Sequence, residues 1–128
     1  MKLKDFLSKT IPGITVSIKL PNGEDSGDTL TIANPSSGFA VAAMRAYQAA
    51  NYAFQREHYN LKAKCEVKQD FSEYNAIAVP FFEELDRDFA TEITVGWSMD
   101  DQFSDVAVGD LYEQLPSAVS GVISASLS

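Results

Sequence analysis

Apolar and polar residues alternate strictly near the start of the chain, over residues 14–20. This period of two puts four side chains on one face of a β-strand: Ile14, Val16, Ile18 and Leu20. A stretch rich in Gly, Asp and Asn follows, and the alternation resumes over residues 29–32. The pattern predicts a β-hairpin with a long loop, spanning about residues 14–33.

The hydrophobic pattern then changes to a helical period. Residues 38–68 contain no proline and many alanines, and Ser36 or Ser37 can accept a hydrogen bond from the first-turn amides as an N-cap. We therefore predict one long helix over about residues 37–68. Its main stripe, with alternating spacings of three and four, consists of Met44, Tyr47, Asn51, Phe54, His58, Leu61 and Cys65.

A second long helix is predicted over about residues 72–96. Its apolar face consists of Tyr74, Ile77, Phe81, Leu85, Phe89 and Ile93. Pro80 lacks an amide donor and disfavours helical geometry in the residue before it, so we expect a kink or a break there. Gly96 suits the C-terminal end of this helix.

Two short helices complete the pattern, over about residues 104–115 and 116–127, with Ser104 as an N-cap and Pro116 as a first helical residue. A two-stranded hairpin is only marginally stable in water, so it must pack on the helices. The predicted fold class is α+β and mostly helical. We expect a single domain over residues 1–128, in which an N-terminal β-hairpin packs on a bundle of about four helices.

The apolar stripe on the first long helix must be buried against another surface. This surface is either the apolar face of residues 81–89 in the same chain or a second copy of the chain. Asn51 and His58 favour an interface slightly, because polar side chains in a helix seam cost less where water or a partner satisfies them. Trp97, at a predicted helix end, can fill the core or form an exposed anchor, and we favour the core. The candidate partner or self-association surface comprises Met44, Tyr47, Asn51, Phe54, His58, Leu61, Trp97 and Phe103.

The net negative charge of the chain disfavours some classes of partner. The chain of 128 residues carries a net charge of −8 at pH 7, with a sequence pI near 4.4. Such a field repels phosphate backbones and anionic headgroups, so we expect neither nucleic-acid nor membrane binding. Residues 1–9 lack the apolar block of a secretory signal, and the single Cys65 suits a reducing compartment. We therefore expect a cytoplasmic protein.

Candidate catalytic and metal-binding residues are few. The one histidine, His58, and the one cysteine, Cys65, are seven residues apart, or about 10.5 Å along a helix, too far for a hydrogen bond that activates a thiolate. They cannot complete a zinc site, and residues 22–28 lack the register of a calcium-binding helix–loop–helix. Glu84, Asp86 and Asp88 are predicted to lie on the outer, solvated side of the second helix. The sequence thus predicts no enzyme activity, no cofactor and no metal.

Short motifs in the C-terminal third resemble a known family. Val95-Gly96-Trp97-Ser98 is followed by Phe103-Ser104 and then by Leu115-Pro116-Ser117-Ala118. This arrangement resembles the tail assembly chaperones of long-tailed bacteriophages. The resemblance implies a morphogenesis factor in the host cytoplasm that binds the long, helical tape measure protein and other tail proteins, and that is absent from the mature virion. The alternatives are an acidic immunity or inhibitor protein, and a structural tail or connector component.

Overall fold

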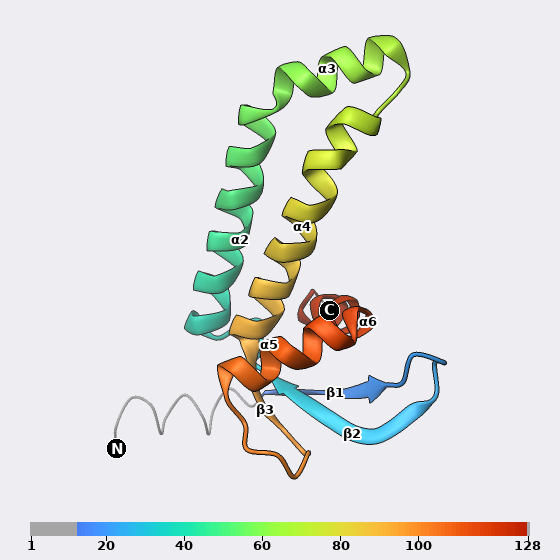
Figure 1. The fold of residues 1–128 in the computed structure, drawn as a ribbon. Helices are drawn as coiled ribbons and strands as arrows, with labels where there is room; N and C mark the ends of the chain where they lie inside the picture. The colour runs from blue at the N-terminus through green and yellow to red at the C-terminus, as the bar shows by residue number, and fades with distance from the viewer. Residues whose placement is uncertain (1–12, 128) are drawn as a thin grey trace.

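The computed structural model describes residues 13–127, and within that range it has three strands and five helices (Figure 1). The strands are β1 (Ile14–Lys19), β2 (Asp25–Ile32) and β3 (Thr94–Trp97). The helices are α2 (Gly38–Glu57), α3 (Tyr59–Lys68), α4 (Ser72–Ile93), α5 (Asp105–Gln114) and α6 (Pro116–Ser126). The fold is therefore α+β and mostly helical, as predicted. The expectation for residues 1–9 lies outside the described residues.

The molecule consists of a base and an arm (Figure 1). The base contains the sheet, α5, α6 and the C-terminal end of α4. α2 and α4 run side by side away from this base, and α3 continues from α2 beyond a bend before the chain returns into α4. We use the name arm for residues 45–85.

The sheet is antiparallel, with the order β1-β2-β3. On β1 the predicted alternation holds, because Ile18 is buried between two exposed neighbours, whereas Leu20 lies beyond the strand and is exposed. Gly13 precedes β1 in close contact with β2. A Cβ atom on Gly13 would lie 2.7 Å from the carbonyl oxygen of Ile32, so a larger residue there would push the two strands apart.

The third strand corrects the predicted extent of the second helix. α4 ends at Ile93 rather than at residue 96, and residues 94–97 pair with β2. The buried Thr94 hydroxyl donates a hydrogen bond to the carbonyl oxygen of Ala90, at 2.6 Å, so it accepts the one that joins it to the Tyr112 hydroxyl, also at 2.6 Å. The helical period of the sequence ends at Ile93, and sheet pairing and this buried contact then place residues 94–97 in a strand.

The predicted single helix over residues 37–68 is two helices that meet at His58. This residue leaves helical geometry, with φ −107° and ψ 16°, while its backbone N–H still bonds the carbonyl oxygen of Phe54 at 3.0 Å. Its ring lies against the Phe54 ring, with centroids 4.2 Å apart. The bend turns α3 toward the start of α4, and Cys65 is buried there.

α4 continues through Pro80, so the break considered for this position is absent. Proline removes one intrahelical hydrogen bond, and tertiary packing offsets that loss. The Phe54 ring of α2 contacts Tyr74 before the proline and both Phe81 and Phe82 after it. Both halves of α4 are therefore held against the same partner.

The hydrophobic core lies in the base, between the sheet, the end of α4, and α5 and α6. Its largest fully buried side chains are Tyr112, Leu30, Ile32, Ile93, Val108 and Val122. Of the apolar face predicted for the second helix, Phe89 and Ile93 belong to this core. Phe81 instead stacks on Phe54 in the arm, so one helix face serves two separate clusters.

Tyr47 joins the arm to the base. Its hydroxyl donates a hydrogen bond of 2.6 Å to Oδ1 of Asp86, and its ring centroid lies 5.3 Å from that of Phe89. The prediction that Asp86 lies on the outer side of its helix is therefore wrong, because this carboxylate is half-buried against α2. Burial, and then the bond to the Asp86 carboxylate and its charge, raise the pKa of Tyr47 from 10.0 to about 12. The neutral phenol is therefore part of the folded state.

Alkaline titration of Tyr47 is expected to destabilise the fold. A pKa that is higher in the folded than in the unfolded state contributes stability below about pH 10 and loses it as the pH rises to about 12. We expect the free energy of unfolding, measured in urea, to fall less steeply across this interval in Tyr47→Phe than in the unsubstituted chain. Equal slopes of unfolding free energy against pH for the two proteins would contradict the raised pKa of Tyr47. Tyr112, whose pKa burial also raises, contributes to the slope that remains.

Candidate functional site

The structure brings part of the predicted partner surface together on the inside of the arm. Phe54 is 4% exposed, and its ring stacks on that of Phe81 with centroids 4.3 Å apart. Tyr47, His58 and Leu61 are half-buried on the same side of α2 and α3. This part of the stripe faces α4 within one chain.

The other members of the predicted surface lie apart. Met44 lines a hollow of about 410 Å³ where α2, α4 and the end of α6 meet. Asn51 accepts a hydrogen bond of 2.9 Å from Gln55 on its own helix. Trp97 and Phe103 form an edge-to-face pair, with centroids 5.3 Å apart, and both pack partly buried against the core of the base. Trp97 and Phe103 are thus not part of one surface with the arm residues.

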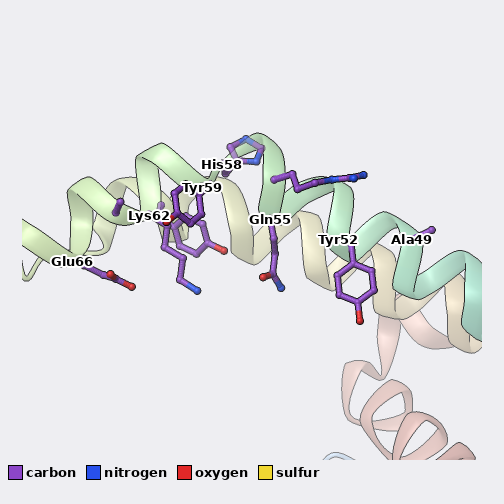
Figure 2. Close-up of a pocket in the computed structure, with 10 residues that line it drawn as sticks. Ala49, Tyr52, Gln55, His58, Tyr59, Lys62 and Glu66 are labelled. Atoms are coloured by element: carbon purple, nitrogen blue, oxygen red, sulfur yellow. The ribbon is translucent and has the colours of Figure 1, made fainter.

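A different face of the same helices is open. A groove of about 950 Å³ follows α2 and α3 across the bend at His58 (Figure 2). We name it the arm groove, and its lining residues are Ala49, Tyr52, Gln55, Arg56, His58, Tyr59, Lys62, Ala63, Glu66 and Tyr74. Tyr74 is contributed by α4, and all the others come from α2, α3 and the bend between them.

Five residues of the arm groove form an outer stripe with spacings of three and four: Tyr52, Gln55, Tyr59, Lys62 and Glu66. Figure 2 shows Tyr52, Gln55 and Lys62 projecting on the same side of the bent helix pair. Tyr52 is 63% exposed and Tyr59 is 71% exposed. Exposed aromatic residues that share a face are typical of protein interfaces.

Sequence reasoning missed the outer stripe, because its helical period was assigned to the inner stripe one position away. The feature that could have revealed it is the pair Tyr52 and Tyr59, two large aromatics seven residues apart and outside the inner stripe. A second helix face with its own apolar residues indicates a helix that contacts something on two sides.

The arm groove lies on the basic part of an acidic molecule. α2 and α3 carry five cationic residues, Arg45, Arg56, Lys62, Lys64 and Lys68, against two acidic ones, Glu57 and Glu66. Lys62 Nζ lies 5.8 Å from the centroid of the Tyr74 ring, a cation–π contact. In the part of the chain that the structure describes, neither Arg56 nor Lys62 forms an ion pair with a carboxylate.

The lining of the groove is suited to binding. The exposed tyrosines offer contact area, and Arg56 and Lys62 offer charge to a partner. Between residues 13 and 127, no group of three or more His, Cys, Asp or Glu residues is placed to hold a metal ion. Over the same residues, no helix is long and apolar enough to cross a membrane. Fold and groove together indicate a protein-binding module built on a helical arm.

Comparison with known families agrees with this class. The family model for the phage tail assembly chaperone matches residues 13–127. The chain belongs to this family. The match extends well beyond the C-terminal third that carried the resemblance, and no curated protein or solved structure matches the chain. Membership supports a role in tail morphogenesis without catalysis, phage tail proteins as partners, and action in the host cell during assembly.

Proposed function

We propose that this chain binds the tape measure protein during tail assembly and that the arm groove holds a helical segment of it. The family supports a tail protein as the partner. The spacing of the outer stripe supports a helix as the bound form, because residues at intervals of three and four meet the side chains of a second helix. The observation that carries the proposal is the pair of exposed tyrosines, Tyr52 and Tyr59, in the groove.

The same proposal includes where the chain acts. It works in the cytoplasm of the bacterial host and is absent from the mature virion, since a chaperone of assembly leaves its partner when the tail is complete. Its action is non-enzymatic. Contact area and charge are sufficient for holding a helix, and neither requires a cofactor.

The proposal is tested by co-expression with the tape measure protein of the same phage, followed by affinity capture and quantification of the bound partner. We expect the double substitution Tyr52→Ala and Tyr59→Ala to weaken binding by at least about thirtyfold, the effect of removing one interface hot spot. Both side chains are exposed and alanine favours helices, so the fold should be retained. Circular dichroism checks this.

The matched control is Phe39→Ala, which removes an aromatic that is 52% exposed on α2 but lies outside the arm groove. It should capture the tape measure protein as well as the unsubstituted chain does. Undiminished binding by the double tyrosine variant would exclude the groove as the site. Absence of capture by the unsubstituted chain would count against the proposed function as a whole.

Self-association through the arm, the other expectation for the predicted surface, stays a proposal. Its test is the mass from light scattering over a salt series, because salt screens the repulsion between chains of net charge −8. A strictly monomeric mass at high micromolar concentration in every buffer would refute it.

A further inference from the structure

The charge of the arm opposes the charge of the whole molecule. The chain carries −8 overall, whereas residues 38–68 contain five basic and two acidic residues. α4 carries six acidic residues and one basic residue, namely Glu73, Glu83, Glu84, Asp86, Asp88, Glu92 and Arg87. The long-range field therefore attracts basic partners, and the lining of the arm groove attracts acidic ones.

At physiological ionic strength the local charge decides which partner the groove accepts. The Debye length is then about 8 Å, so exposed charges further away are largely screened. A bound segment in the groove meets Arg56 and Lys62 directly, and Glu66 is the one carboxylate of the lining. Neither cation is ion-paired within residues 13–127, so both can contact carboxylates of a partner, Lys62 from its position over the Tyr74 ring.

The outer stripe also limits the shape of the occupant. It extends from Tyr52 on α2 to Glu66 on α3, a path of about 21 Å at 1.5 Å per residue that bends at His58. A partner helix of about 14 residues covers this length. The partner helix needs small or apolar residues on the face that packs on Tyr52 and Tyr59, because a bulky polar face would leave the two rings in water.

We infer that the arm groove selects an amphipathic helix whose apolar stripe packs on Tyr52 and Tyr59 and whose flanking Asp or Glu residues contact Arg56 and Lys62. This inference rests on the proposed function and names the chemistry of the tape measure segment that is bound. Acidic residues of the segment lie opposite the middle of the groove. They avoid the α3 end, where Glu66 repels them.

The inference is tested with two designed helical peptides of about 14 residues that share one apolar stripe and differ only in flanking Glu or Lys. Binding to the full chain is measured by fluorescence polarisation at physiological salt. We expect the Glu peptide to bind about tenfold more tightly than the Lys peptide. Lys62→Glu should abolish or reverse this preference, and Lys62→Met should reduce it without reversal.

The matched control is Arg45→Glu, which changes the charge equally at an exposed position of α2 outside the arm groove. It should keep the preference for the Glu peptide, and melting curves should show every variant folded. A preference for the Lys peptide, or the same response to Arg45→Glu as to Lys62→Glu, would overturn the inference. A third result would also overturn the inference: neither peptide binds, the unsubstituted chain forms a concentration-dependent dimer, and Lys62→Glu abolishes that dimer. The groove would then hold a second copy of the chain.

The two proposals fail in different ways. If the tape measure protein is captured through Tyr52 and Tyr59 but the peptides show no charge preference, the inference about acidic flanks is wrong and the proposed function stands. If the Glu peptide binds the groove but no tape measure protein is captured, the chemistry of the groove is supported and the partner is another protein.

Discussion

Replacing Phe89 by alanine is expected to lower the free energy of unfolding by about 3–5 kcal/mol. Phe89 is 5% exposed and belongs to the core of the base, and its ring also contacts Tyr47 across the α2–α4 interface. Truncation removes buried apolar surface and leaves a cavity between two helices, which adds to the loss. Because the free energy of unfolding of a native protein is only about 5–15 kcal/mol, this substitution would remove a large part of it.

Urea denaturation followed by circular dichroism measures this loss. Phe39→Ala is the matched control, since it makes the same chemical change on a side chain that is 52% exposed. We expect that change to fall within about 0.5 kcal/mol of the unsubstituted chain, as is usual for surface positions. A loss below about 1 kcal/mol for Phe89→Ala would show that this residue is not part of the core in solution.

Phe54→Ala is expected to open the arm while the base stays folded. The Phe54 ring is 4% exposed and packs against His58, Phe81 and Phe82. These residues are separate from the core cluster of the base. The loss of about 3 kcal/mol or more should therefore fall on the local stability of the arm, because a satellite cluster can open without the main core.

Native-state hydrogen exchange distinguishes local from global opening. Amides of α3 and of the first half of α4 should exchange about a hundredfold faster in Phe54→Ala, since each 1.4 kcal/mol corresponds to a factor of ten. Amides of β2, the middle strand of the sheet, serve as the internal reference and should change little. Equal acceleration in β2 and in α3 would mean that the arm and the base unfold as one unit.

The sequence was most informative where structure depends on close neighbours. Strict alternation placed β1, and the fold class followed from the two periods of the apolar pattern. Ser104 caps α5 by accepting a hydrogen bond of 3.1 Å from the Ala107 amide, and Pro116 opens α6. Each of these features involves residues within four positions of one another, so it can be read locally.

The sequence predicted the inner helix face of the arm but not the arm groove on its outer side. The period of three and four correctly located a helix face with Phe54 at its centre, which the structure buries against α4. Periodicity reports that residues share a face, but it does not report what covers that face. Only the tertiary structure shows that α4 covers the inner side of α2 and leaves Tyr52 and Tyr59 exposed in a groove on the other side.

The sequence alone determined the fold class, the acidic charge, the N-terminal hairpin and the presence of a single histidine and a single cysteine. Tertiary structure decided the third strand, the bend at His58 and the arm groove. The physical reason is distance along the chain: the Ser98 hydroxyl accepts a hydrogen bond from the Thr29 amide, 69 residues away, and helps to hold β3 against β2. Residues 94–96 were predicted to be the end of a helix, and residues 94–97 form a strand because β2 supplies backbone partners and Tyr112 a buried hydroxyl.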